Sequence, residues 1–138
     1  MKKRILIIDD DPLLNKINEK VLLAAGFVSE VHITLNGLQA LEYLNSRISK
    51  GYPLPDLIIL DLHMPVMDGF DFLDRYQQMD FAGKRNIVLV VFTGSSSIRD
   101  RQKAEQRGIK NFLNKPYLLR GLTDIVMRMG NQLRVTQV

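Results

Sequence analysis

Short apolar runs alternate with helix-like segments throughout this sequence, and that alternation limits the folds it can adopt. The runs lie at residues 5–8, 57–60, 87–92 and 111–113, with a weaker one at 31–35. Short continuous apolar runs are typical of strands that are buried on both faces of a sheet. Because a helical segment follows each run, the strands should pair in parallel through right-handed crossovers. The sequence therefore predicts a doubly wound α/β fold with five parallel strands and five helices.

Local start and stop signals place the helices. Asp11 before Pro12 is typical of a helix start, because a carboxylate can cap the first turn and proline lacks only an N–H that would stay unpaired there. An apolar stripe recurs every four residues after it, and Gly26 is expected to end this helix. The stripe consists of Leu13, Ile17, Val21 and Ala25.

Four further helices are expected. The first of them should carry Leu38, Leu41 and Leu44, and the second should cover about residues 68–79. The third should run from a cap at Ser96 or Ser97 to Gln106. The last should carry Leu118, Leu122, Ile125, Val126 and Met129. Residues 46–55 contain Gly51, Pro53 and Pro55, which predicts a loop. A short polar tail is expected after Asn131.

Length and composition favour one globular domain over residues 1–138, with a core at about 3–130. The chain has no cysteine, which excludes disulfides, thiolate metal sites and cysteine nucleophiles. The basic start is followed by too few apolar residues for a signal peptide, and the run at 87–92 is too short to cross a bilayer. We therefore expect a cytoplasmic protein that does not bind membranes.

The charges are unevenly distributed along the chain. Residues 1–83 hold 8 Lys/Arg and 12 Asp/Glu, a net charge of −4, whereas residues 84–138 hold 11 and 3, a net charge of +8. Such asymmetry can indicate a nucleic-acid contact. The basic residues are scattered, however, and no aromatic residues that could stack on bases lie between them. A solvated basic face is the favoured interpretation, and a nucleic-acid-binding module remains an alternative.

Polar residues follow four of the apolar runs. Asp9 and Asp10 follow the first, Asp61 ends the third, Thr93 ends the fourth, and Lys115 follows the last. The carboxyl ends of parallel strands lie at one edge of the sheet, where ligands bind in such folds. We therefore expect these side chains to meet.

Three carboxylates without a histidine or cysteine cluster predict a site for Mg²⁺ or Mn²⁺. The ion would relieve the repulsion among Asp9, Asp10 and Asp61. Asp61 could then attack phosphorus and form an acyl phosphate. Lys115 would supply positive charge, and the Thr93 hydroxyl would donate to a phosphoryl oxygen.

Four sequence blocks, IIDDDP, PDLIILDLHMPVMDG, VVFTG and NKPY, resemble those of the response-regulator receiver domain, the CheY-like, flavodoxin-like fold. Their order and spacing agree over roughly residues 3–130. The resemblance implies the strand order 2-1-3-4-5 and a phosphoacceptor at Asp61.

The same resemblance assigns further roles. It implies that Asp10, Asp61 and the backbone carbonyl of His63 bind the metal directly, with Asp9 acting through water. It also implies a switch hydroxyl at Thr93, a phosphate-pairing cation at Lys115, a switch aromatic at Phe112 and a cis bond before Pro116. Even with this resemblance, Asp11 is interpreted as a helix cap, and Phe112 is interpreted equally well as a core residue.

His63 departs from the family pattern, which often has asparagine two residues after the acceptor. We expect its side chain to lean over the mouth of the site, together with Ser95. These two residues should influence how readily water reaches the acyl phosphate, so its lifetime cannot be inferred from relatives.

The expected function is that of a stand-alone, single-domain response regulator. It would accept a phosphoryl group from a sensor histidine kinase or a histidine phosphotransfer protein, promote its own phosphorylation and dephosphorylation, and then bind an unidentified downstream protein. A phosphorelay shuttle or phosphate sink shares every site residue. A phosphatase with an aspartyl nucleophile is the alternative from another class, but it needs a second aspartate two residues after the nucleophile, where this chain has His63.

Overall fold

The computed structural model of this protein describes residues 2–136, and it describes side chains as far as residue 129. Strands and helices alternate along the chain in the order that the sequence predicts. The elements are β1 (Lys3–Ile8), α1 (Pro12–Ala24), β2 (Val28–Thr34), α2 (Gly37–Lys50), β3 (Leu57–Leu60), α3 (Gly69–Gln78), a short 3₁₀ helix (Lys84–Asn86), β4 (Val88–Thr93), α4 (Ile98–Gln106), β5 (Asn111–Asn114) and α5 (Leu119–Thr136).

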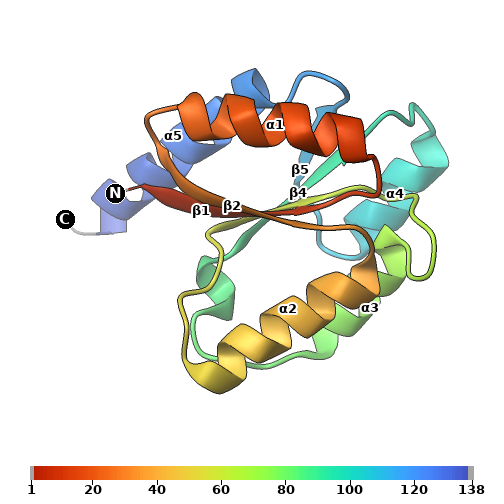
Figure 1. The fold of residues 1–138 in the computed structure, drawn as a ribbon, viewed down its shortest axis with the longest axis horizontal. Coiled ribbons are helices and arrows are strands. Elements are labelled where there is room, and N and C mark those ends of the chain that lie inside the picture. The colour runs from red at the N-terminus through yellow and green to blue at the C-terminus, as the bar shows by residue number, and fades with distance from the viewer. Residues whose placement is uncertain (1, 137–138) are drawn as a thin grey trace.

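The strands form one parallel sheet in the order β2-β1-β3-β4-β5, which confirms the expected fold class and strand order. Helices α1 and α5 cover one face of the sheet, and α2 and α3 cover the other (Figure 1). The chain order reverses beside β1, because β2 lies on one side of it and β3 on the other. This is the place where open α/β sheets bind ligands.

Alternating side chains of the strands build two apolar cores. In β1, Leu6 and Ile8 pack toward α2 and α3, whereas Ile5 and Ile7 pack toward α1 and α5. The four residues of β3 are buried almost completely, as a central strand covered on both faces requires. The sheet therefore provides a rigid base for the residues at its carboxyl edge.

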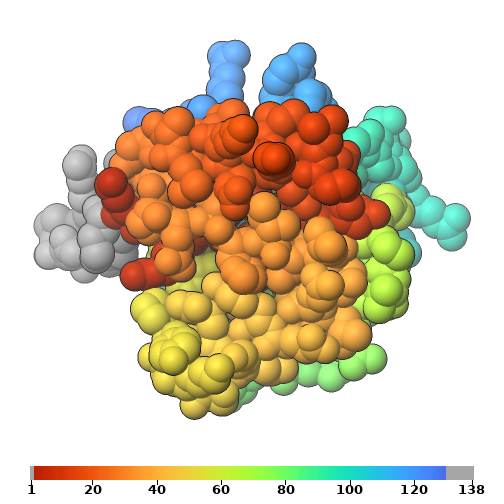
Figure 2. All heavy atoms as spheres, viewed as in Figure 1, coloured from red at the N-terminus to blue at the C-terminus, as the bar shows by residue number. Residues whose placement is uncertain are grey.

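Helix α1 presents most of its apolar stripe to solvent. Leu13, Ile17 and Val21 are 70%, 49% and 40% exposed, whereas the face toward the sheet carries Asn15, Asn18 and Leu22. The rotation of the helix is set at its start, where the Asn15 side chain donates to the Asp9 carbonyl at 2.7 Å. The helix ends at Ala24 with Ala25 as its C-cap, so Gly26 is the first residue beyond the cap, where a helix-ending glycine is expected. Figure 2 shows that α1 (red to orange) forms part of the outer surface of the molecule.

Helix α2 extends further than the sequence pattern indicates. It runs to Lys50 and ends at Gly51, whose φ of 68° lies in the left-handed region that favours glycine. The predicted loop from residue 46 is therefore wrong for its first five residues. Arg47 lies over the rings of Tyr43 and Tyr52 and donates to the Pro53 carbonyl, which stabilises this last turn.

The sequence predicts a short polar tail after Asn131. Helix α5 continues to Thr136, so most of this tail is helical. Residues 137 and 138 of the predicted tail lie outside the described residues. Within residues 2–136, none of the helices combines the length and the apolar character that crossing a bilayer requires.

Candidate functional site

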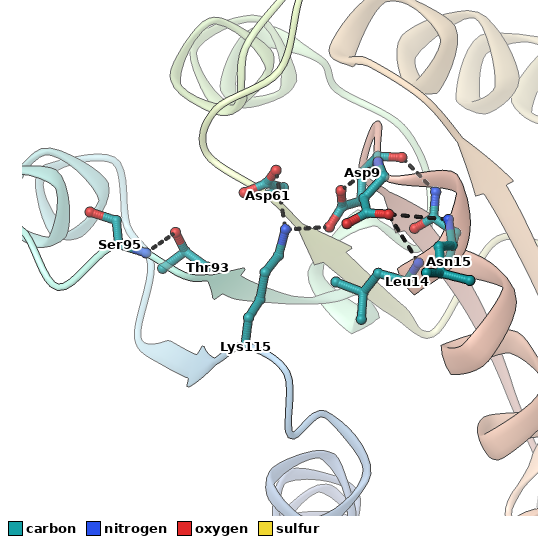
Figure 3. A network of polar contacts seen from close by, with 9 residues as sticks. Asp9, Leu14, Asn15, Asp61, Thr93, Ser95 and Lys115 are labelled. Atoms are coloured by element: carbon teal, nitrogen blue, oxygen red, sulfur yellow. Dashed lines mark hydrogen bonds and ion pairs between the residues drawn. The ribbon is translucent and has the colours of Figure 1, made fainter.

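The polar residues that follow the strands meet at the carboxyl edge of the sheet. Asp9 and Asp10 follow β1, Asp61 follows β3, and Lys115 follows β5. In Figure 3 the Lys115 ammonium group points between the carboxylates of Asp9 and Asp61. Its Nζ lies 2.8 Å from Asp9 Oδ2 and 3.4 Å from Asp61 Oδ2. The convergence expected from the fold is therefore present.

The acidic residues fit a hard divalent cation. One carboxylate oxygen from each of Asp9, Asp10 and Asp61 can be chosen so that all three lie within 4.8 Å of one another. Asp9 and Asp61 are buried, whereas Asp10 is exposed to solvent. Lys115 offers one positive charge against three carboxylates, and oxygen donors are the ligands that Mg²⁺ and Mn²⁺ prefer. Geometry and charge thus both leave room for an ion.

The electrostatics of the two central groups support the same conclusion. Burial, followed by the charge of Asp9, raises the pKa of Asp61, although Lys115 and the His63 backbone act in the opposite direction. Burial opposes the charge of Lys115, but its contacts with Asp9 and Asp61 outweigh burial and raise the pKa of Lys115. The site therefore holds a charged lysine beside a carboxylate whose charge is unfavourable without further neutralisation.

Local contacts fix the position of Asp9. Its Oδ1 accepts from the Asp11 backbone N–H at 3.0 Å, and its carbonyl accepts from Asn15. Asp11 itself accepts from the backbone N–H groups of Leu13 and Leu14, so its interpretation as a helix cap is confirmed. Asp11, the third aspartate of the run, therefore caps α1, whereas Asp9 and Asp10 belong to the group of carboxylates that could hold a metal ion.

Thr93 is buried at the end of β4, and its hydroxyl oxygen accepts from the Ser95 backbone N–H at 3.1 Å. Thr93 lines a hollow of about 260 Å³ together with Phe112 and Arg101. The Arg101 guanidinium carbon lies over the half-buried Phe112 ring, 4.4 Å from the centre of the ring. The hollow gives both Thr93 and Phe112 space for a change of orientation.

The Lys115–Pro116 bond is cis, as the family resemblance implies.

His63 and Ser95 lie at the mouth, and both contact a residue that the sequence patterns did not single out. His63 Nε2 is 2.6 Å from Asp100 Oδ2, and Ser95 Oγ donates to the same oxygen at 3.0 Å. A charged residue in the first turn of a predicted helix is too common a feature to indicate such a contact.

Gly69 is a second residue that the patterns did not reveal. A Cβ at this position would lie 2.5 Å from the Asp61 carbonyl oxygen and 2.8 Å from Leu62 Cα. The Gly69 N–H donates to the Leu62 carbonyl at 3.0 Å. The start of α3 can therefore approach the carboxyl end of β3 only because residue 69 has no side chain.

Comparison with known sequences identifies the family. Residues 5–127 match the response regulator receiver domain. The chain belongs to this family. Receiver domains are signalling modules of two-component systems rather than classical enzymes. They are phosphorylated on an aspartate by histidine kinases, and they bind Mg²⁺ in an acidic pocket.

Curated relatives of this receiver domain include regulators and kinases. A probable transcriptional regulator, ycf29 of Porphyra purpurea, is 32% identical over 85% of the chain and 51% of its own length. The nitrate/nitrite response regulator NarL of Escherichia coli is 34% identical over 80% of the chain and 47% of its own length. The sensor histidine kinase CheAY of Helicobacter pylori is 32% identical over 90% of the chain and 14% of its own length. The receiver domain thus spans about half the length of these relatives, or less.

Solved structures of similar size share the fold. A two-component response regulator from Cytophaga hutchinsonii is 26% identical with a TM-score of 0.83, and the match covers 95% of this chain and 99% of the other. The Mn²⁺-bound form of the response regulator Rcp1 is 28% identical with a TM-score of 0.71, covering 90% and 88%. The receiver fold therefore accounts for nearly the whole described chain.

Proposed function

We propose that this receiver domain accepts a phosphoryl group on Asp61 and thereby changes its affinity for a downstream protein. The observation that carries the proposal is the placement of the Lys115 ammonium group between the Asp9 and Asp61 carboxylates, at the edge where Thr93 also lies. Membership of the receiver family supports the same role.

The chemistry is a phosphoryl transfer to a carboxylate. An Asp61 oxygen attacks phosphorus, the bond from phosphorus to the donor histidine nitrogen breaks, and the electron pair stays on that nitrogen. The Lys115 ammonium group neutralises charge on the transferred group. The Thr93 hydroxyl donates to a phosphoryl oxygen once it has turned from Ser95. Positioning and neutralisation of this kind are the main requirements of phosphoryl transfer.

A divalent cation fits the remaining charge of the site. Asp9, Asp10 and Asp61 would hold Mg²⁺ or Mn²⁺, with Asp10 and Asp61 as direct ligands and Asp9 acting through water. The bound ion would neutralise negative charge on the phosphoryl oxygens. The Mn²⁺-bound form of the similar Rcp1 supports this assignment. The role of the His63 carbonyl as a further ligand stays a prediction.

The exposed stripe of α1 supports a protein as phosphodonor. Leu13 and Ile17 lie in the first two turns of the helix, which begins two residues after Asp10. Apolar side chains beside an anionic pocket suit a partner that presents a phosphohistidine on an amphipathic helix. A sensor histidine kinase or a histidine phosphotransfer protein has the required chemistry.

The signal would travel from Thr93 to the surface around Phe112. A phosphoryl group adds about −1.5 to −2 charges and three strong acceptor oxygens. Thr93 turning inward would enlarge the hollow that Phe112 lines, so this ring could move into it. The outer surface of α4 and β5 would then change shape, which is the change that a downstream protein would detect.

Phosphotransfer from a purified sensor histidine kinase carrying radiolabelled phosphohistidine tests the proposal. We expect label on the wild-type protein, loss of that label in alkali as for an acyl phosphate, and no label on the Asp61→Asn variant. Label that persists in the variant would contradict the assignment.

Addition of an unlabelled histidine phosphotransfer protein then distinguishes two related roles. A terminal response regulator keeps the label until hydrolysis, whereas a phosphorelay shuttle passes it on. The self-promoted phosphorylation and dephosphorylation, the cytoplasmic location, and the interpretation that the basic half is a solvated surface stay predictions.

A further inference from the structure

Three side chains from separate segments share one contact at the mouth of the site. The Asp100 Oδ2 atom lies 2.6 Å from His63 Nε2 and accepts from Ser95 Oγ at 3.0 Å. His63 follows β3, Ser95 follows β4, and Asp100 lies in the first turn of α4. We call this arrangement the Asp100 latch.

The latch matters because α4 has few other attachments. Ala104 is its one buried residue. Arg107 pairs with Asp74 of α3 at 2.8 Å near the C-terminal end, and Lys103 lies over the Phe70 ring at 4.1 Å. A helix with so little buried apolar surface shifts at a small free-energy cost. Its polar contacts therefore decide its position.

A chain of hydrogen bonds joins the latch to Thr93. The Ser95 side chain donates to Asp100, while the Ser95 backbone N–H donates to Thr93 Oγ1 at 3.1 Å. Ser95 Oγ also accepts from the Ser97 backbone N–H, and Ser97 caps α4 through Asp100 N–H. The loop after β4 is thus held in the arrangement in which the Thr93 hydroxyl faces Ser95 (Figure 3).

That arrangement competes with phosphoryl binding. In the switch proposed above, the Thr93 side chain turns toward a phosphoryl oxygen on Asp61, and this rotation carries Oγ1 away from the Ser95 N–H. The loop that carries Ser95 then loses one of its hydrogen bonds, and a shift of the loop would weaken the contact of Ser95 with Asp100. The latch is therefore formed in the unphosphorylated arrangement and opposes the phosphorylated one.

We propose that Asp100 is a positioning residue that stabilises the unphosphorylated arrangement of the loop after β4. Part of the free energy with which a phosphoryl group binds is then needed to break the latch. This inference rests on the proposed function and extends it to a residue of α4. If the latch lowers the affinity for a phosphoryl group by some factor, then by linkage a phosphoryl group at Asp61 lowers the equilibrium constant for latch formation by the same factor.

The test is the affinity for beryllofluoride, a phosphoryl mimic, in the presence of Mg²⁺, followed by ¹⁹F nuclear magnetic resonance. We expect Asp100→Ala to bind beryllofluoride about threefold to tenfold more tightly than the wild type, the range that one or two partly exposed hydrogen bonds allow. A merely structural role would leave the affinity unchanged or weaken it, and either result would overturn the proposal.

Asp74→Ala is the matched control. It also removes a carboxylate that holds α4, through Arg107, but it lies at the end of the helix remote from the mouth. We expect its affinity for beryllofluoride to equal that of the wild type. An equal tightening in both variants would mean that any loosening of α4 suffices, and the specific role of Asp100 would be wrong.

Ser95→Ala separates the latch from the contribution of Asp100 to the helix dipole. This variant removes one bond of the latch without changing the charge of α4, so it should also tighten beryllofluoride binding. In the Ser95→Ala, Asp100→Ala double variant the two effects should be less than additive, because both act on one contact. Full additivity would contradict a shared latch.

Amide hydrogen exchange without Mg²⁺ separates this proposal from the proposed function. Asp100→Ala should speed exchange at the Ser95, Ser97 and Asp100 amides, whereas Asp74→Ala should not. Faster exchange with unchanged beryllofluoride affinity would overturn the coupling. If the wild type itself binds no beryllofluoride, the proposed function fails and the coupling fails with it, while the exchange rates still report whether the contact forms.

Discussion

Asp61 carries an unfavourable charge in the metal-free protein. Because burial and Asp9 raise the pKa of Asp61, its protonated form is favoured on folding. Its contribution to stability is present below the pKa of the unfolded chain, about 3.9, and is lost as the pH rises through the higher pKa of the folded state. At neutral pH, Asp61→Asn should therefore raise the thermal midpoint in EDTA.

Saturating Mg²⁺ should reverse the order, because the ion stabilises the wild type more than a variant that lacks one ligand. Differential scanning calorimetry measures both midpoints. The exposed Asp80→Asn is the control for a change of net charge and should have no such metal dependence. A lower midpoint for Asp61→Asn in EDTA would contradict the electrostatic description of the site.

Tyr76 offers a second test at the level of a single residue. Its hydroxyl is buried without a hydrogen-bond partner among the described residues, and burial raises the pKa of Tyr76 to about 12. The unfolded chain releases this proton near pH 10, so unfolding releases protons and stability falls between about pH 10 and 12. Tyr76→Phe should lose this part of the alkaline decline in urea denaturation.

At pH 7 the Tyr76→Phe variant should be as stable as the wild type, within about 1 kcal/mol, because it removes an unpaired buried hydroxyl. The variant retains the aromatic ring and the nearby Lys84 ammonium group, which lies 5.0 Å from the centre of the ring. A larger loss at pH 7 would indicate a hydrogen-bond partner that the structure does not contain.

At the scale of elements, the start of α3 packs closely against the backbone of Asp61 and Leu62. Gly69→Ala would force its Cβ against the backbone of Asp61 and Leu62, which cannot give way as a flexible side chain would. We expect a loss of about 1–3 kcal/mol in the free energy of unfolding, as for other overpacked sites. Labelling of Asp61 should also slow.

The control for this variant is Gly26→Ala. No atom lies within 4 Å of a Cβ at Gly26, so the free energy of unfolding should change little. Urea denaturation with labelling by acetyl phosphate measures both properties. If Gly69→Ala matched Gly26→Ala in both, the close approach of α3 to the strand would be wrong.

The exposed apolar side chains at the start of α1 should affect phosphotransfer from a donor protein but not from a small-molecule donor. Leu13→Ser with Ile17→Ser should slow phosphotransfer from a histidine kinase at least tenfold, since apolar anchors at interfaces often contribute about 2 kcal/mol or more. Labelling by acetyl phosphate should be unchanged, because the small donor makes no contact with the helix. Leu23→Ser, which is 47% exposed on another side of α1, is the matched control. Equal slowing with both donors would contradict a docking role.

Helix α1 also marks a limit of sequence patterns. The spacing of Leu13, Ile17 and Val21 predicts an amphipathic helix, and the helix is present. The pattern could not predict which face meets the sheet, because Asn15 sets the rotation through its contact with the Asp9 carbonyl, while Asp11 caps the first turn. Similarly, Pro53 and Pro55 indicated a loop, but Gly51 alone ends α2.

For the whole molecule, the alternation of strands and helices was sufficient to predict the sheet and the edge at which its functional residues meet. Residues that follow strands were therefore found from the sequence. Asp100 and Gly69 were not found, because their roles depend on the distance between segments that a linear pattern does not contain. The order of the strands and the cis bond before Pro116 came from the family resemblance.

The whole fold places one carboxylate where it can carry phosphorus, and the most direct test of this claim is the intact mass of the protein after incubation with acetyl phosphate and Mg²⁺. We predict one added phosphoryl group on the wild type, and none when EDTA replaces the metal or when Asp61 is changed to asparagine. A wild-type mass without the increment, or an undiminished increment in Asp61→Asn, would contradict phosphorylation at this site.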